Sequence, residues 1–194
     1  PLQFEEFELP SRPAPGELLC RVRMSTICGS DLHTIHGRRQ EPTPLVLGHE
    51  IIGEVEQLGD GIDRDGYGQP LRVGDRVSWS IAASCGACFY CDHALPQKCD
   101  DLRKYGHLSS VESPSLTGGF AEHVVILPGT AVFKVPDRLT DAIAAPANCA
   151  LATVVHGITA IGLTQGETVL IQGAGLLGLN LCALACERGA ESVI

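Results

Sequence analysis

Four cysteines stand close together near the middle of the chain, at Cys85, Cys88, Cys91 and Cys99. Tetrahedral zinc takes four thiolates at about 2.3 Å, and a loop this short can wrap around one ion with its amides turned towards the sulfur atoms. A bacterial iron–sulfur run shares the C-x2-C-x2-C opening but continues x3-C-P, whereas here Asp100 follows the fourth cysteine. Four buried, reduced thiols without a metal are the other alternative, yet these would not gather beside glycine, aspartate and lysine. The spacing therefore favours a closed zinc site around which this part of the chain must fold.

Composition and charge narrow the class of protein. The 194 residues include 44% hydrophobic and 19% charged side chains, which is ordinary for a globular chain with a buried core. The net charge of -9 opposes a nucleic-acid partner, because such binding needs clustered lysine and arginine. No apolar stretch approaches the roughly 20 residues that cross a bilayer, and the acidic N-terminal segment lacks the features of a signal peptide. We therefore expect a cytoplasmic protein with neither nucleic-acid nor membrane partners, whose nine cysteines stay reduced.

The hydrophobic pattern changes along the chain. Up to about Val135, short β-branched runs separated by glycine, proline and aspartate predict strands, at residues 16–23, 51–55, 72–77 and 121–126. After Pro136 the sequence predicts a helix over 141–161, a buried strand over 167–171, a glycine turn, a helix over 176–187 and a strand from 192. That order begins a parallel, doubly wound sheet. Because the chain starts at Pro1 and stops inside the last expected strand, we expect a fragment.

A second, dispersed set of metal-binding residue types lies outside the four-cysteine loop. It consists of Cys28, His49, which is followed by Glu50, and Cys149. A lone cysteine or histidine is more often a core residue than a ligand, so each is weak evidence by itself. The information lies in the combination and in the sequence around each residue.

Taken together, these motifs resemble those of the zinc-containing medium-chain dehydrogenases, the zinc-containing alcohol dehydrogenase family. They follow in family order from about residue 16 to 194: Cys28-Gly-Ser-Asp-x-His33, Gly48-His-Glu50, Gly74-Asp-Arg-Val77, the four-cysteine loop, Gly118-Gly-Phe-Ala-Glu122 and Gly173-x-Gly-x-x-Gly178. The resemblance implies an α/β protein with a mainly β GroES-like catalytic domain over residues 1–152. The first βα unit of a Rossmann domain, truncated at its C-terminus, would follow over residues 153–194.

The resemblance also implies two zinc ions with different roles. A catalytic zinc would be held by Cys28, His49 and Cys149, with water or substrate in the open fourth position. The four-cysteine loop would hold a structural zinc. Glu50 would lie behind the catalytic metal. Asp31 would accept a hydrogen bond from His49 and so orient the imidazole. Both carboxylates could equally be solvated loop residues.

An open zinc site predicts alcohol chemistry. The metal is a Lewis acid that lowers the pKa of a bound hydroxyl, so that an alkoxide forms near neutral pH and expels hydride. In the family the proton leaves through a hydroxyl at the position of Ser30, the cofactor ribose and an imidazole at the position of His33. His33 could instead be an ordinary loop histidine. The other histidines have no motif support and are predicted to be structural or solvent-facing: His36, His93, His107, His123 and His156.

A glycine-rich turn predicts the cofactor. The sequence Gly173-Ala-Gly175-Leu176-Leu177-Gly178 follows an apolar strand and opens a helix, which is the context in which backbone amides face a pyrophosphate. The resemblance places Thr153 near the nicotinamide ring, although it could be helix filler. The acidic residue that binds the cofactor ribose would come about 20 residues after the turn, past the last residue of the chain. NAD is therefore a family preference, with NADP not excluded.

These observations predict a zinc-dependent oxidoreductase that transfers hydride between a small alcohol or polyol and NAD(P), acting as a homodimer or homotetramer. A catalytically silent zinc-binding relative with a structural or binding role is the alternative, and the intact ligand set together with Ser30 and His33 disfavours it. The zinc-free quinone reductases of the superfamily lack both cysteine sets, which this chain has.

The sequence gives fewer clues to the substrate. Some family members have a cation after the first zinc cysteine, where this chain has Gly29. The segment that follows is also similar to dehydrogenases associated with phosphonate catabolism. Arg38 and Arg39 would then meet an anionic substrate, or else be surface arginines. Trp79 and Ile81 suggest an apolar wall of the alcohol pocket.

Overall fold

The chain forms two compact units that divide between Ala145 and Pro146. The computed structural model describes residues 2–111 and 116–194. The division falls before the expected domain boundary at residue 152, so Cys149 belongs to the second unit.

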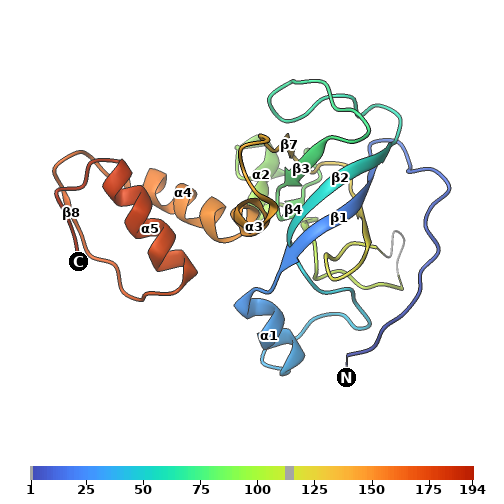
Figure 1. Cartoon of the computed structure of the whole chain (residues 1–194), viewed down its shortest axis with the longest axis horizontal. Helices are drawn as coiled ribbons and strands as arrows, with labels where there is room; N and C mark the ends of the chain where they lie inside the picture. The colour runs from blue at the N-terminus through green and yellow to red at the C-terminus, as the bar shows by residue number, and fades with distance from the viewer. Residues whose placement is uncertain (1, 112–115) are drawn as a thin grey trace. The chain divides into compact units, whose positions relative to one another are not determined.

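A five-stranded antiparallel sheet organises the first unit, and Figure 1 shows its two long strands, β1 and β2, side by side. The strand order is β6-β1-β2-β3-β7, with bounds Leu18–Thr26 for β1, Glu50–Leu58 for β2, Arg76–Trp79 for β3, His123–Ile126 for β6 and Val132–Lys134 for β7. Leu18 pairs with Leu58 on one side and with Ile126 on the other. Because successive side chains of a strand point to opposite faces, Leu18 and Cys20 enter the main core while Leu19 joins a separate cluster.

The main core lies against this sheet and is closed by aromatic residues. Val77 and Trp79 alternate inward from β3 and are almost fully buried. The Trp79 ring meets the ring of Tyr105 edge-on, with centroids 6.1 Å apart. The Tyr105 hydroxyl accepts the backbone N–H of Leu127 at 2.8 Å and shares a hydrogen bond with Thr130. The loop after the cysteine motif is thereby anchored to the sheet.

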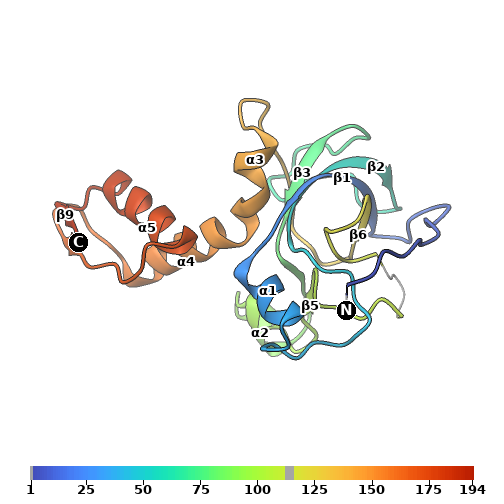
Figure 2. The same cartoon turned by 60° about the horizontal axis from the view of Figure 1, so that its bottom comes forward.

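Short elements complete the first unit. They are α1 (Gly29–Ile35), β4 (Ala82–Ala83), α2 (Phe89–Asp92), η1 (Pro96–Lys98), β5 (Arg103–Lys104) and α3 (Asp141–Ala144). In Figure 2, α1 follows directly from the end of β1. Asp141 at the start of α3 forms ion pairs with Arg23 of β1 and Arg76 of β3, at 2.9 and 2.8 Å, so α3 is fixed to the sheet.

Three of the expected elements are wrong in detail. The buried strand expected over 167–171 is only the two-residue strand β8 (Thr168–Val169), and Leu170 after it is exposed. The strand expected over 72–77 begins only at Arg76, because residues 72–75 form a turn. Gly74 has a φ of +89° and the Asp75 carboxylate accepts the N–H of Arg72. The helix expected over 141–161 is interrupted, because Pro146 has no N–H for a helical hydrogen bond and Cys149 leaves helical geometry at φ -108°, ψ -82°. The stretch becomes α3, the 3-10 helix η2 (Ala145–Asn148) and α4 (Ala150–Ile161).

The second unit contains α4, β8 (Thr168–Val169), α5 (Leu176–Glu187) and β9 (Ser192–Val193). Strands β8 and β9 are parallel, and both views show α4 and α5 lying alongside each other. The α5 bounds are those predicted from the sequence. Among the described residues no single helix has the length and apolar composition needed to cross a membrane, and only residues 141–148 and 150–161 taken together pass that test.

Candidate metal centres and cofactor turn

The pairing of β1 with β2 brings Cys28 and His49 together. Thr26 at the end of β1 lies opposite Glu50 at the start of β2. Cys28 comes two residues after Thr26, and His49 comes directly before Glu50. Both residues therefore lie at the same edge of the sheet. The ligand atoms of Cys28, His49 and Glu50 all lie within 4.8 Å of one another.

Asp31 contacts both metal-ligand candidates of this edge. It is fully buried, and its Oδ2 accepts the backbone N–H of Cys28 at 2.8 Å. Its Oδ1 lies 3.3 Å from Nδ1 of His49, which is only 2% exposed. Burial alone would raise the pKa of Asp31, but the contact with His49 and the backbone N–H of Cys28 outweigh it, and the pKa is lowered. A carboxylate at Nδ1 keeps the proton on that nitrogen and leaves Nε2 as a ligand atom.

The other polar groups of this edge come from α1, β1 and β2. The Ser30 hydroxyl lies 3.4 Å from Nε2 of His49. Burial raises the pKa of the Cys28 thiol, but hydrogen bonds from Ser30 and the neighbouring His49 lower it by more, so the net pKa is lowered. Glu50 is 2% exposed and accepts the hydroxyl of Thr26 at 2.5 Å. The edge thus holds a thiol of lowered pKa, an imidazole beside a carboxylate and a second, hydrogen-bonded carboxylate.

Gly48, the residue before His49, can pack against Phe120 only because it has no side chain. Gly48 has a φ of +92°, and a Cβ at this residue would lie 2.7 Å from the ring of Phe120 and 2.9 Å from its backbone nitrogen. The carbonyl of Gly48 accepts the N–H of Gly119 at 2.8 Å. The Gly48-His-Glu motif and the Gly118-Gly-Phe motif, noted separately in the sequence, are therefore in direct contact.

Three of the predicted site residues, His33, Cys149 and Thr153, have roles that the structure of each unit taken by itself does not test. His33 lies on α1 with an exposed side chain. Cys149 precedes α4 in the second unit, and its carbonyl accepts the Thr153 hydroxyl at 2.7 Å. The Thr153 hydroxyl thus bonds within its own helix. The roles of these three residues stay predictions.

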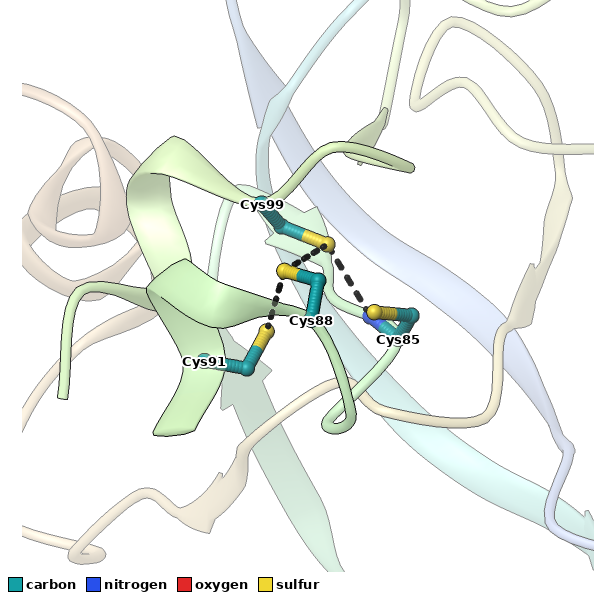
Figure 3. Close-up of side chains that lie close together, drawn as sticks. All are labelled: Cys85, Cys88, Cys91 and Cys99. Atoms are coloured by element: carbon teal, nitrogen blue, oxygen red, sulfur yellow. Dashed lines mark hydrogen bonds between the residues drawn. The ribbon is translucent and has the colours of Figure 1, made fainter. Parts of the chain in front are cut away.

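The four-cysteine loop gathers its thiols around one point, as Figure 3 shows. Sγ of Cys88 lies 3.6 Å from Sγ of Cys91 and 3.9 Å from Sγ of Cys99, and all four ligand atoms fall within 4.8 Å of one another. The backbone N–H of Cys85 donates to Sγ of Cys99 at 3.2 Å. No disulfide joins any of the nine cysteines, all of which lie in the described residues.

The donor chemistry of this loop fits zinc. A tetrahedron with metal–sulfur bonds of about 2.3 Å has edges of about 3.8 Å, close to the two printed sulfur separations. Backbone N–H groups of Asp100 and Cys91 lower the pKa of Cys88 to about 6. The N–H of Cys85 acts to lower the pKa of Cys99, but burial and neighbouring thiols raise it to about 11. Binding of a metal ion would displace the protons of these thiols and leave thiolate ligands.

His107 is a further residue beside His49 that no sequence motif singled out. It is 8% exposed, and its ring centroid lies 5.3 Å from that of His49 with the ring planes 30° apart. Its Nδ1 lies 3.0 Å from Oε1 of Glu41, which also binds the guanidinium of Arg39. The pKa of His107 is lowered, mainly by burial and then by the charge of Arg39. No local sequence pattern could have found it, because it is 58 residues from His49 along the chain.

The residues suggested for the substrate have other neighbours in the structure. Arg39 is engaged by Glu41, whereas Arg38 is exposed. Trp79 is 1% exposed and packs in the sheet core, while Ile81 is partly buried. Nothing in these contacts identifies a substrate.

The glycine-rich turn of the second unit has the predicted strand–turn–helix setting. Gly173 has a φ of +108°, and Gly175 precedes the first residue of α5. A Cβ on Gly178 would lie 1.9 Å from the carbonyl oxygen of Gly173, so only glycine allows the turn to close. Leu176 and Leu177 are exposed at the helix N-terminus, where unpaired backbone N–H groups attract an anion.

Comparisons with known proteins agree with these arrangements. Residues 14–137 match the alcohol dehydrogenase GroES-like domain, which confirms the fold predicted for this part of the chain. The chain is 35% identical to 5-exo-hydroxycamphor dehydrogenase of Pseudomonas putida, over 99% of the chain and 53% of that protein. It resembles the crystal structure of an alcohol dehydrogenase from Thermotoga maritima with a TM-score of 0.92 and 36% identity, covering 100% of the chain and 53% of that structure. It also resembles acetophenone reductase from Geotrichum candidum in complex with NAD, with a TM-score of 0.77 and 31% identity over 93% of the chain and 50% of that structure. The chain spans about half the length of the relatives it matches.

Proposed function

The chain belongs to the zinc-dependent medium-chain alcohol dehydrogenase family, and on that premise we propose that it supplies the catalytic part of an enzyme that transfers hydride between a small alcohol or polyol and NAD(P). The observation that supports this most directly is the buried edge at His49. There an imidazole with Asp31 at its Nδ1 stands next to the thiol of Cys28. Such a pair is typical of a metal site and would be costly as an idle core arrangement.

We propose that zinc is held by Cys28 and His49 of the first unit and by Cys149 of the second. When bound there, zinc supplies a Lewis acid that lowers the pKa of an alcohol hydroxyl. Asp31 holds the imidazole of His49 in the tautomer that offers Nε2. Glu50, hydrogen-bonded to Thr26, adds a negative charge next to the ligands.

The hydroxyl of Ser30 is the first proton acceptor along the proposed relay. It lies 3.4 Å from Nε2 of His49, so it stands beside the atom that would bind the metal. The exposed imidazole of His33, one turn further along α1, is suited to pass the proton to solvent. The cofactor ribose would connect the two groups.

The glycine-rich turn is proposed to bind the cofactor pyrophosphate through the N-terminal amides of α5, with Thr153 near the nicotinamide. Gly173 and Gly175 have open space at their Cβ positions, which leaves the backbone of this turn accessible to a phosphate group, and Gly178 allows the turn to close. The four-cysteine loop is proposed to hold a second, structural zinc that fixes the segment from Cys85 to Cys99.

The test is hydride transfer by the protein that carries this chain. We expect NAD(P)H to form with a primary or secondary alcohol, to cease when zinc is removed and to return when zinc is restored. Full turnover by protein shown to hold no metal would contradict the proposal. Two bound zinc ions without turnover on any alcohol or polyol would favour the catalytically silent alternative.

A further inference from the structure

Two segments cross closely behind His49. Residues 44–49 and 105–110 run antiparallel, with a bridge between Leu45 and Ser109 and a hydrogen bond from the N–H of Ser110 to the carbonyl of Pro44 at 2.8 Å. At the crossing, a Cβ on Gly106 would lie 2.7 Å from the carbonyl oxygen of Gly48. The two backbones can approach this closely because Gly106 has no Cβ, whereas the missing Cβ of Gly48 leaves room for Phe120.

The crossing places one histidine after each glycine. His107 follows Gly106 and His49 follows Gly48, and their rings lie alongside each other with centroids 5.3 Å apart and planes 30° apart. Both side chains are at most 8% exposed. Rings that are neighbours at this separation in a closely packed interior limit how far each can turn about its Cβ–Cγ bond.

Glu41 and Arg39 fix the position of His107. Oε1 of Glu41 lies 3.0 Å from Nδ1 of His107, and the same oxygen binds Nε of Arg39. The Glu41 side chain is 12% exposed, so its charge is largely withdrawn from solvent and compensated by the guanidinium. A carboxylate this close to a ring nitrogen favours a proton on that nitrogen and restricts the orientation of the His107 ring.

We propose that His107, held by Glu41 and Arg39, is a positioning residue that sets the ring tilt of His49 at the metal site. This inference rests on the proposed function. The lone pair of Nε2 lies in the imidazole plane, so a metal is bound well only when that plane has the correct tilt. Asp31 holds the edge of the ring at Nδ1, and His107 lies beside the ring itself. Both contacts restrain rotation about the Cβ–Cγ bond, from two different sides of the same ligand.

The experiment compares variants of the full chain loaded with cobalt(II), whose visible absorption depends on ligand geometry. His107→Phe keeps a flat ring beside His49 but loses the proton that faces Glu41. Glu41→Gln keeps the shape of the side chain and removes its charge, and it also serves if His107→Phe fails to fold. Cys28→Ser identifies which cobalt bands belong to the His49 site and which to the four-cysteine loop.

The matched control is His123→Phe. His123 also forms a close pair with a carboxylate, at 3.0 Å from Oε2 of Glu56, but it lies on β6 and belongs to neither metal group. Its loss should therefore leave both sets of cobalt bands unchanged.

We expect His107→Phe and Glu41→Gln to shift the Cys28-dependent bands and to weaken cobalt binding at that site about tenfold, the lower end for partners of metal ligands. The bands of the four-cysteine loop should not change. Parent-like bands and affinity in both variants would overturn this inference alone, as would an equal change in His123→Phe. A parent chain without Cys28-dependent bands would overturn the proposed function as well.

Discussion

Asp31 has two contacts whose effects can be separated. Its Oδ2 accepts the N–H of Cys28 and so caps α1, while its Oδ1 faces Nδ1 of His49. Asp31→Asn keeps a side-chain oxygen for the cap and removes the negative charge beside the imidazole. The variant should fold normally but bind zinc at the Cys28 site about 10 to 100-fold more weakly, as for other carboxylates behind a metal-bound histidine. Competition with a chelator measures the affinity.

Asp75 provides the control for this prediction. Like Asp31, it accepts the backbone N–H three residues before it, in this case from Arg72. It pairs with Lys134 at the surface and does not contact a proposed ligand. Asp75→Asn should leave zinc affinity unchanged. Equal affinity for zinc in Asp31→Asn and the parent would remove Asp31 from the site.

Cys20 should behave as a core residue and not as a reactive thiol. Burial, with a smaller contribution from the charge of Glu56, raises its pKa from 9.0 to about 12. At pH 8 a thiol reagent should modify the exposed Cys186 in the folded chain and spare Cys20, which mass spectrometry of the labelled peptides would reveal. Because the folded pKa is the higher one, this thiol contributes stability below pH 9 that is lost as the pH rises towards 12. Rapid labelling of Cys20 without denaturant would contradict its burial.

At the scale of elements, prediction succeeded where local signals agreed. Helix α5 has an apolar stretch, a glycine turn before it and Gly189 after it, and its bounds are those predicted. The expected helix over 141–161 failed because its alanine-rich composition concealed the break at Pro146. The contact between His49 and His107 could not be predicted at all, because it depends on two glycines that meet only in the folded chain.

Gly48 tests how strictly the contact between the segment before His49 and Phe120 depends on glycine. Gly48→Ala would bring a methyl group to 2.7 Å from the Phe120 ring in addition to the strain of a positive φ. Gly37 also has a positive φ, +70°, but open space around its Cβ position, so Gly37→Ala is a control for strain alone. We expect Gly37→Ala to cost about 1 kcal/mol and Gly48→Ala a further 1–3 kcal/mol, roughly the cost of overpacking.

The single tryptophan, Trp79, reports the unfolding of both variants, because it is buried in the sheet core of the unit that contains Gly37 and Gly48. Urea titrations followed by its fluorescence give the two free energies of unfolding. Equal destabilisation by the two alanine substitutions would mean that Phe120 can move aside and that its contact with Gly48 does not require glycine.

For the whole molecule, the sequence predicted the family fold, whereas the domain boundary expected at residue 152 stays a prediction. The ligand motifs are local and could be read directly, as could the glycine turn of the second unit. The division between Ala145 and Pro146 depends on which residues pack together in the folded chain. It places Cys28 and His49 in one unit and Cys149 in the other.

That division leads to a prediction about metal content. Residues up to Ala145 include all five strands of the large sheet, its core clusters and the complete four-cysteine loop. A chain ending there should fold cooperatively with the structural zinc in place, but without Cys149 it should lose the other metal. The full chain should hold about two zinc ions, and both the shortened chain and the full-length Cys149→Ala variant about one. Metal analysis and melting curves are the measurements. Two tightly held ions in the shortened chain would exclude Cys149 as a ligand. A shortened chain that does not fold would show that the first unit depends on the second.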